Sequence, residues 1–436
     1  MSCQPDFTNK ALSCFVILDI STAEMKALRQ LALATVFFCG SANSLLADEF
    51  ENFTYEDMGT YIAITDYPDT AVGPVVIPAT IAGKPVKVIE ATAFNEVLGL
   101  TSVTLPSSVT TIGSDAFALC PALTSVSIPS SVTSIGASAF YECTALTGLV
   151  LPSSVTIIGE QAFFHCSGLT ELIIPAGVTI IESKICEGCV GLTRVTLGGS
   201  VTTIRNDAFT GCHGLTNMTI PNTVSTIENY AFFDCIGLKS VKIPSAVTSI
   251  GNGAFDDCDA LDDVFFLGDA PAFGETVFVA PDNNPDLTLY FYSGKSGFTA
   301  PFWQPENYQF SYKTESMGPE NPAAPWLILN GLPFDSDLQE DSNHDGVSLL
   351  MAYALDLDPS KNLGGSLPKP VIGANQLGLS YYSGAPGITY TVEASTDLTN
   401  WTIAGVSVSA PDGNLIRTAT VPVGTGPRFM RLMVEK

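Results

Sequence analysis

Cysteines, histidines and one short acidic run are the residues of this chain whose types and spacing could do chemistry. Among 436 residues there are 11 Cys and only 3 His. His165 and His213 occupy different positions of the repeat described below, so their side chains are not expected to converge. The sequence contains no HExxH motif, no recognisable Ser-His-Asp arrangement and no glycine-rich phosphate loop. These residues therefore favour a protein without catalytic activity.

Seven of the cysteines recur at intervals of 23 residues. They are Cys120, Cys143, Cys166, Cys189, Cys212, Cys235 and Cys258. Equal positions in stacked coils lie one strand spacing apart with side chains pointing the same way, which suits stacking better than bridging. We therefore predict that these cysteines are buried free thiols. Cys186 and Cys189 form a CxxC pair that resembles a redox or zinc half-site, but without a second pair a core substitution at Cys186 is the favoured interpretation.

The acidic run resembles the opening of a calcium loop. Loop positions 1, 3, 5 and 6, which supply oxygen ligands and the tight turn, are held by Asp341, Asn343, Asp345 and Gly346. The run departs from the calcium pattern at position 9, which is Leu349, and at position 12, where Ala352 replaces the bidentate Glu. We therefore expect weak calcium binding or none. The alternative is a helix over residues 348–355 that follows an Asp-Gly turn and packs on the next domain.

The elements that position the cysteines come from a 23-residue repeat, which occurs in seven copies without a gap. The copies begin at Leu100, Leu123, Leu146, Leu169, Leu192, Leu215 and Leu238. Position 1 is always Leu, position 10 Val, position 13 Ile and position 21 Cys, and Ala-Phe fills positions 17 and 18 in six copies. Residues 77–99 form an eighth copy with a short insertion, and residues 261–283 begin in register and then diverge.

The repeat predicts a stack of short strands. One copy reads LTSVSIPSSVTSIGASAFYECTA, in which the alternating Leu, Val and Ile at positions 1, 4 and 6 indicate a strand with one buried side. Pro at position 7 ends that strand, and VTSI forms a second extended segment. One unit cannot bury its apolar side alone, so units must stack about 4.8 Å apart. The predicted fold is mainly β, a right-handed solenoid of about eight or nine coils with two narrow parallel sheets.

The pattern LxxVxIPxSVxxIGxxAFxxCxx resembles the bacterial leucine-rich repeat of the BspA-like surface proteins, over residues 72–283. The resemblance implies a secreted or cell-surface protein that binds a protein, or a ligand of the extracellular matrix or cell envelope. It supplies no catalytic residues and no cofactor.

The composition excludes several classes of partner. The chain has 44 Asp plus Glu against 18 Lys plus Arg, a formal net charge of −26. This charge argues against nucleic acids and anionic membranes, because both require clustered Lys and Arg. The mean hydropathy is +0.30. The chain after Asp48 nevertheless has no uncharged apolar run of about 20 residues, so no membrane span is expected in the mature chain.

The N-terminal region has the order of a secretory signal peptide. Two basic residues precede the apolar run 31–39, and small or neutral residues then lead to Ala47. We expect residues 1–47 to be an upstream segment and signal peptide, with translation starting at Met25. A buried N-terminal helix is the alternative.

The remaining chain changes character after the repeats. The predicted organisation is an N-terminal cap at 48–76, the solenoid at 77–283, its C-terminal cap at 284–314, a Pro-rich linker at 315–325, a helical or calcium-loop-like segment at 326–365 and a β domain at 366–436. Runs such as ITYTVEAST and LIRTATVPV alternate apolar and polar residues, which predicts a small antiparallel, sandwich-like domain. It resembles a C-terminal module of secreted bacterial proteins.

Two groups of outward-facing side chains are candidate partner-binding sites. On the first strand, Val150 and Ile173 form an apolar island, flanked by the charges of Glu171 and Arg194. At position 19, an aromatic patch is formed by Tyr141 and Phe164. The alternatives are an ordinary Thr- and Ser-rich strand surface for the first group and the covered edge of the core for the second.

The preferred hypothesis is a non-enzymatic, secreted or cell-surface repeat protein that mediates protein binding or adhesion. The alternative is a glycan-binding surface protein that acts through its C-terminal β domain. The aromatic residues that would stack on sugars are Trp303, Tyr381, Tyr382 and Trp401.

Overall fold

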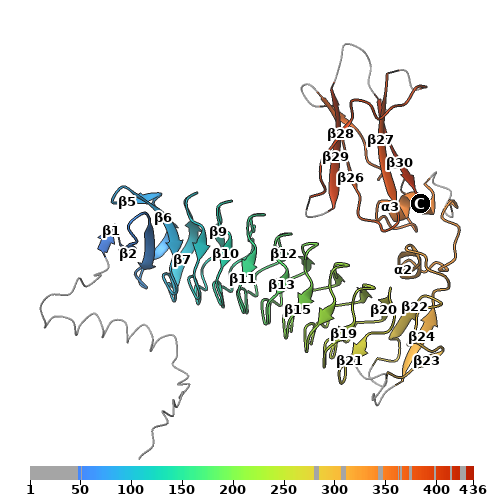
Figure 1. The fold of residues 1–436 in the computed structure, drawn as a ribbon, viewed down its shortest axis with the longest axis horizontal. Helices are drawn as coiled ribbons and strands as arrows, with labels where there is room; N and C mark the ends of the chain where they lie inside the picture. Colours follow the sequence, from blue (N-terminus) through green and yellow to red (C-terminus); the bar gives the residue numbers. More distant parts are fainter. Residues whose placement is uncertain are drawn as a thin grey trace, which may run out of the picture. The chain divides into compact units, whose positions relative to one another are not determined.

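The computed structural model describes residues 48–50, 52–278, 284–305, 311–341, 347–361, 363, 366–372, 376–396, 399–412, 415–422 and 429–436. The predicted signal segment and the calcium-loop residues Asn343 and Asp345 lie outside these ranges. The chain divides into units 1–46 and 47–436, and the fold described here is that of the second unit. It is mainly β with about 3% helix, a parallel β-solenoid followed by antiparallel sheets (Figure 1). The predicted fold class is confirmed.

The solenoid begins with an antiparallel meander of three strands. It is made of β1 (Asp48–Phe50), β2 (Phe53–Asp57) and β3 (Ile62–Asp66). β3 then pairs in parallel with β6 (Lys84–Ile89), which also forms a small hairpin with β5 (Thr80–Ile81). The chain therefore enters the parallel ladder before the first complete repeat.

The first strands of the coils form one side of the solenoid. An N-terminal group pairs in the order β4 (Val72–Val76), β7 (Gly99–Thr104) and β9 (Ser125–Ser127). A second group pairs in the order β12 (Glu171–Ile173), β14 (Arg194–Thr196), β16 (Asn217–Thr219), β18 (Ser240–Ile243), β20 (Asp263–Phe266), β22 (Thr288–Phe291), β24 (Tyr312–Ser316) and β23 (Phe302–Trp303). These pairs are parallel except for β23 with β24. We call this side the first-strand face.

The VTSI segments form a second side, again as two groups. The first continues from β6 through β8 (Thr111–Ile112) and β10 (Ser134–Ile135) to β11 (Ile157–Ile158). The second runs through β13 (Ile180–Ile181), β15 (Thr203–Ile204), β17 (Thr226–Ile227), β19 (Ser249–Ile250) and β21 (Ala272–Phe273). Equal repeat positions pair throughout, as the 23-residue period requires.

The Ala-Phe-Cys segments form a third side built from stacked turns, which we call the turn side. Residues at repeat positions 16 and 20 have positive φ, for example 54° at Asp115 and 57° at Leu119. The N–H groups of Asp115, Phe117 and Leu119 donate to carbonyls of the following coil at 2.8, 2.8 and 2.7 Å. The turns thus join successive coils by backbone hydrogen bonds, as the strands do.

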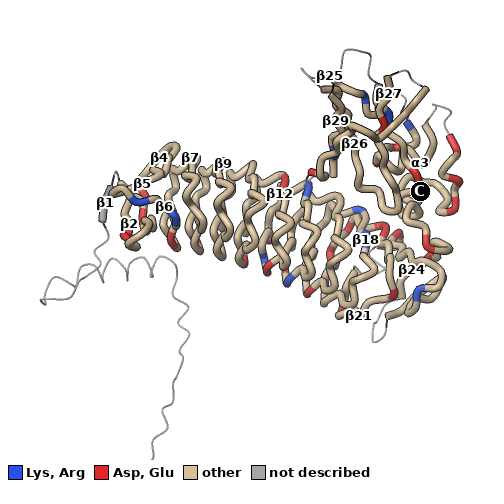
Figure 2. Tube along the Cα trace, turned by 45° about the horizontal axis from the view of Figure 1, so that its top comes forward, with Lys and Arg blue, Asp and Glu red and all other residues tan. Residues whose placement is uncertain are grey.

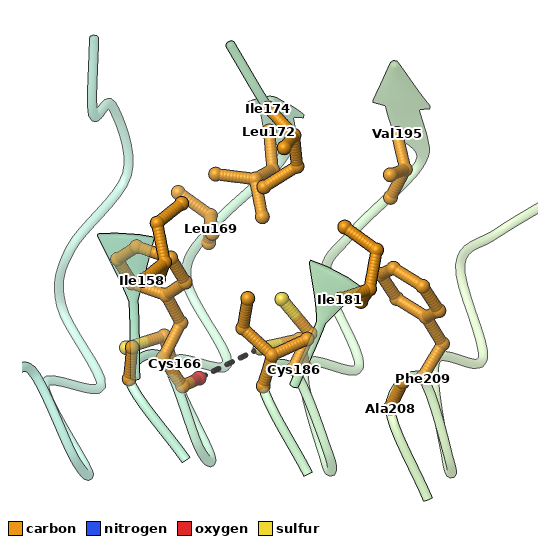
Figure 3. Packing of buried hydrophobic residues seen from close by; sticks show 14 of the residues in the cluster. Ile158, Cys166, Leu169, Leu172, Ile174, Ile181, Cys186, Val195, Ala208 and Phe209 are labelled. Carbon is orange, nitrogen blue, oxygen red and sulfur yellow. Dashed lines mark hydrogen bonds between the residues drawn. The ribbon is translucent and has the colours of Figure 1, made fainter. Parts of the chain in front are cut away.

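The core consists of ladders of identical residues between these three sides (Figure 3). The position-18 rings stack between coils, with ring centroids 5.5 Å apart for Phe117 and Phe140 and 5.8 Å for Phe140 and Phe163. All eight described cysteines are free and buried, which agrees with the thiol prediction. Each ladder thiol donates to a backbone carbonyl of the preceding coil, as Cys143 does to Phe117 at 3.0 Å. The cysteine is therefore a buried hydrogen-bond donor as well as a small core residue.

The solenoid has about 11 turns over the described residues, more than the eight or nine predicted. The difference arises at both ends, where the repeat pattern fades but the pairing continues. β4 pairs with β7 at the start, and β22 and β24 extend the ladder beyond β20. Apolar alternation continues in these strands, and Leu289, Phe291 and Tyr312 are buried in the core.

Two short helices follow the solenoid. α2 (Ala324–Leu329) starts next to Pro325, and α3 (Leu349–Ala354) is capped by Ser348, whose hydroxyl accepts from the Met351 N–H. Ala324 packs with Phe265, Tyr292 and Met317 in a small cluster of its own. In the part of the chain that the structure describes, no helix is long and apolar enough to cross a membrane.

The C-terminal β domain contains two antiparallel sheets. One has the order β25 (Val371–Ile372), β26 (Gln376–Tyr382), β29 (Ile416–Pro422) and β28 (Ser407–Val408). The other pairs β27 (Thr389–Ser395) with β30 (Phe429–Glu435). Side chains such as Leu379, Val392 and Ala419 form a common core between the sheets, as in a sandwich.

Candidate functional site

An exposed apolar island lies on the first-strand face. Val150 is 82% exposed and Ile173 is 36% exposed, whereas their neighbours Leu149 and Leu172 are buried. Alternation along the strand explains this difference, because successive side chains point to opposite faces. Each isoleucine or valine here stands at repeat position 5, where most other coils carry Thr or Ser. Val150 and Ile173 are thus both exposed, and their use as one partner-binding surface stays a prediction.

A pair of opposite charges flanks the island. Glu171 and Arg194 are directly opposite each other on β12 and β14, with Arg194 Nε 3.8 Å from Glu171 Oε1. Both side chains are about half exposed, so the pair adds little stability and leaves both charges available to a partner. Toward the N-terminus the sequence has no Lys or Arg between Lys87 and Lys184, and charged positions are sparse along β7 to β11 (Figure 2). The island therefore lies where a neutral surface meets a charged one.

The predicted aromatic pair lies on the turn side. Tyr141 and Phe164 stack with centroids 4.7 Å apart and an interplanar angle of 4°, and Phe164 also stacks with His165 at 4.4 Å. Burial raises the pKa of the Tyr141 hydroxyl, and the nearby carboxylates of Glu142 and Glu187 raise it further. Both rings of the pair are partly buried. The pair covers part of the core edge and presents its remaining surface beside acidic groups.

The two candidate groups occupy different sides of the coil, so the structure does not unite them into one site. The island belongs to the first-strand face, and the aromatic pair belongs to the stacked turns that follow the second strand. Sequence numbering gives the repeat position of each residue, but it does not give the exposure. Val150 and Ile173 are thus the more accessible apolar group, while Tyr141 and Phe164 are the more covered one.

The ladder is interrupted between coils 146–168 and 169–191, a place that we call the joint. On the first-strand face, Gly148 makes one isolated bridge to Ser125, and within the described residues no strand pair links coil 146–168 to β12. On the second side, β11 ends one sheet and β13 begins another. The turn side continues, since Phe163 donates to Ile185 at 2.9 Å. Two of the three sides are therefore unpaired at the joint.

The residue type at repeat position 14 changes at this interruption. Repeat position 14 is glycine in the three coils before the joint, and a Cβ added at Gly113 would lie 2.6 Å from the backbone nitrogen of Ala91. Glu182 is the first residue with a side chain at this position after those glycines. Arg205 follows it and still donates its N–H to Ile181 at 3.0 Å. The break thus falls between a coil that has glycine at position 14, Gly159, and a coil that has a residue with a side chain there, Glu182.

Sequence reasoning missed the joint, although a signal was present. Coil 169–191 carries Ile185 and Cys186 where six other coils carry Ala-Phe. The stack of rings accordingly stops at Phe163 and resumes with Phe209 and Phe232, 5.4 Å apart. Ile185 is larger than the usual Ala, and Cys186 is smaller than the usual Phe, so the two changes in volume offset each other. Both side chains are fully buried.

The calcium-loop prediction is only partly within the described residues. Asp341 is described, while Asn343 and Asp345 are not. Leu349 and Ala352, which stand at loop positions 9 and 12, are buried in α3 and offer no side-chain oxygen. The predicted helix after the loop is present. Among the described residues, no group of three or more His, Cys, Asp or Glu is placed to hold a metal ion.

The aromatic residues considered for glycan binding do not form an open platform. Trp303 is 6% exposed and Tyr381 is 3% exposed, so their ring faces are inside the protein. The guanidinium of Arg431 lies 4.4 Å from the centre of the Trp401 ring, and Arg431 also pairs with Glu393 at 2.6 Å. A sugar would have to displace this charged contact. The geometry gives the glycan alternative no support.

The described fold defines a leucine-rich repeat solenoid protein. The family model for the BspA type leucine rich repeat region matches residues 87–216 and 179–289. Among solved structures, a leucine rich cell surface protein from Faecalibacterium prausnitzii A2-165 is 31% identical, covering 57% of this chain and 77% of that chain with a TM-score of 0.46. A leucine-rich repeat protein from Bacteroides ovatus ATCC 8483 is 25% identical, covering 56% and 70% with a TM-score of 0.47. No curated protein matches the chain. The chain belongs to the BspA-type leucine-rich repeat family.

Proposed function

We propose that this chain is a secreted or cell-surface protein whose solenoid binds another protein, without catalysis, through the first-strand face around Val150 and Ile173. The observation that carries the proposal is the exposure of Val150, 82%, in a coil whose other apolar first-strand side chains, Leu146, Leu149 and Leu151, are buried. Membership of the family supports a protein partner. Exposed apolar residues beside a charged pair are typical of the centre and rim of protein interfaces.

The partner is first sought with the full chain as bait, against cell-envelope and host extracts, with a glycan array run in parallel. Binding of each identified protein is then measured with Val150→Asp. A buried carboxylate at the interface centre costs several-fold to a hundredfold in affinity, so we expect a loss of at least about tenfold, or about 1.4 kcal/mol.

Thr219→Asp is the matched control, because Thr219 is exposed at the same repeat position on the same face, three coils away. It adds the same charge and is expected to leave binding nearly unchanged. Equal binding by the parent chain and both variants would exclude the island as the contact. Array hits on residues 366–436, without protein capture, would favour the glycan alternative.

The aromatic pair is a second proposed contact surface, carried by the ring stack beside Glu142 and Glu187. A variant with Tyr141→Ala and Phe164→Ala distinguishes it from the island. Loss of binding in this variant, with Val150→Asp unaffected, would move the site to the turn side.

Two further proposals concern export and calcium. We propose that residues 1–47 direct export and that the C-terminal β domain is a spacer or attachment module. N-terminal sequencing of the protein recovered outside the cell tests the first part, since a start near Asp48 is expected.

We also propose weak calcium binding, or none, around Asp341, Asn343 and Asp345. Calorimetry with calcium on the full chain should show little or no heat.

A further inference from the structure

The CxxC pair is the one place in the described solenoid where a single coil puts two thiols into the core. Cys186 replaces the position-18 phenylalanine, and Cys189 is the ladder cysteine of the same coil. Both side chains have 0% exposure. Figure 3 shows Cys186 inside the core, with Cys166 of the preceding coil and Phe209 of the following coil on either side. The pair is not used by the proposed binding function.

The backbone brings the two cysteines together in a tight turn. The Cys189 N–H donates to the Cys186 carbonyl at 3.1 Å, and Gly188 within the turn has φ of 73°, which suits glycine. The first and last Cα atoms of such a turn are less than about 7 Å apart, and disulfides usually join Cα atoms about 4.4–6.8 Å apart. A disulfide between Cys186 and Cys189 is therefore within reach of the existing backbone.

The thiol of Cys186 is also directed differently from the ladder thiols. Cys189 donates to the Phe163 carbonyl at 3.1 Å, and Cys212 donates to the Cys186 carbonyl at 3.3 Å. Cys186 instead has the Cys189 thiol of its own coil within hydrogen-bonding reach, whereas the ladder thiols Cys235 and Cys258 make such a contact between two coils. Among the described contacts, the polar partner of the Cys186 thiol is thus the sulfur with which it would react.

The joint supplies a route for a reagent. Hydrogen-bond ladders are missing there on two sides, so opening coil 169–191 breaks fewer bonds than opening another coil. Local opening is easiest where backbone hydrogen bonds and stacked contacts are fewest. Burial raises the pKa of the Cys186 thiol well above its usual range, so the closed coil holds a protonated, unreactive thiol. The Cys186 thiol therefore reacts only after the coil has opened at the joint.

We propose that Cys186 and Cys189 are a redox-active pair that forms an intramolecular disulfide with a low-molecular-weight disulfide as oxidant, while the other ladder cysteines remain thiols. One cysteine loses its proton, and its thiolate attacks the small disulfide, which releases one small thiol and leaves a mixed disulfide. The second cysteine attacks the protein sulfur of that mixed disulfide and releases the second small thiol. Two electrons and two protons pass to the oxidant, and Cys189 gives up its bond to the Phe163 carbonyl.

The sequence offers a direct assay. Trypsin cleaves after Lys184 and after Arg194, so residues 185–194 form a peptide with both cysteines and no others. The folded full chain is incubated with oxidised glutathione, quenched in acid, denatured, alkylated without reductant and digested. We expect this peptide to lose both alkyl groups and to be two hydrogens lighter than the dithiol, and reductant to reverse the change. Cys212 and Cys235, in the peptide 206–239, should stay alkylated.

The matched control restores the usual repeat residues with Ile185→Ala and Cys186→Phe. Six other coils carry this Ala-Phe pair, so the variant is expected to fold, which circular dichroism checks. Cys189 should then remain alkylated like its neighbours. The proposal is overturned if residues 185–194 stay doubly alkylated, if they stop at the mixed disulfide, or if all ladder cysteines oxidise at the same rate. The control has no Cys186, so loss of the Cys189 alkyl group there would show that Cys189 reacts with another partner. That result would also contradict the proposal.

Discussion

At the scale of single residues, the glycines at repeat position 14 before the joint leave no room for a side chain. Gly113 and Gly136 both face the backbone of the preceding coil, and each donates its N–H to an isoleucine carbonyl there, at 2.7 and 2.8 Å. A side chain added at Gly113 or Gly136 would meet that backbone, although Arg205 and Glu228 carry side chains at position 14 and make the equivalent bond at 3.0 and 2.8 Å. Gly148 is different, because an added Cβ there would have no neighbour within 4 Å.

We expect Gly113→Ala to destabilise the solenoid by about 1–3 kcal/mol, the usual cost of overpacking a tight contact. Gly148→Ala makes the same chemical change in open space and should alter the free energy of unfolding by less than about 0.5 kcal/mol. Urea denaturation of the two variants measures the difference. Equal destabilisation would show that the close approach at Gly113 does not limit stability.

The residue types of the core were predictable, because each core position of the repeat carries the same residue type in successive coils. Val109, Ile112, Phe117 and Cys120 are all buried, as their fixed positions indicate. The greater exposure of Val150 than of Ile173 was not predictable, because the sequence does not show that strand pairing is lost between coil 146–168 and β12. The function of the cysteine thiols as donors was also hidden, since the acceptor carbonyls belong to another coil.

At the scale of elements, the joint separates two groups of strands that the sequence presents as one array. The period of 23 residues continues across the joint, so the repeat spacing in the sequence does not reveal the break in strand pairing. The break coincides with three local departures from the repeat, at Glu182, Ile185 and Cys186. Each alone is an ordinary core or surface substitution, and the structure shows that they lie beside the lost pairing.

We expect backbone amides at the joint to exchange with deuterium faster than their equivalents one coil later. Within the described contacts, no acceptor is assigned to the N–H groups of Thr179 and Glu182, whereas Thr202 donates to Thr179 at 2.8 Å and Arg205 donates to Ile181 at 3.0 Å. Exchange measured by mass spectrometry or NMR compares these pairs directly. Equal protection of the two pairs would contradict an open ladder at the joint.

At the scale of the whole molecule, the C-terminal helices and strands are connected by tyrosine hydroxyls. Tyr390 donates to the Ala354 carbonyl at 2.6 Å, and Tyr353 donates to the Pro386 carbonyl at 2.8 Å. Tyr292 donates to the Asn321 carbonyl at 2.7 Å, at the end of the solenoid. The alternation of residues 366–436 predicted antiparallel sheets, but these connections join residues about 30 positions apart and leave no local pattern.

Alkaline pH should weaken this C-terminal region. Burial raises the pKa of Tyr390 from 10.0 to about 12. A raised folded-state pKa means that the stabilisation is complete below pH 10 and is lost as pH rises toward about 12, since tyrosinate cannot donate a hydrogen bond.

Circular dichroism and tyrosinate absorbance across this range measure the loss, and Tyr390→Phe is the control. The variant should be less stable at neutral pH, and its stability should depend less on pH above 10. An unchanged pH profile would exclude Tyr390 as a contributor.

The joint also has a mechanical consequence. Hydrogen bonds between coils run along the stacking direction, so a pulling force applied at the two ends of the solenoid is carried by the coil interfaces in series. Such a chain of contacts yields first at its weakest interface, which is the one between Val155 and Val178, where two of three sides are unpaired. Each coil that unravels there releases 23 residues, or roughly 80 Å of extended chain. The solenoid would therefore lengthen from its middle under load, while the coils at its two ends keep their shape.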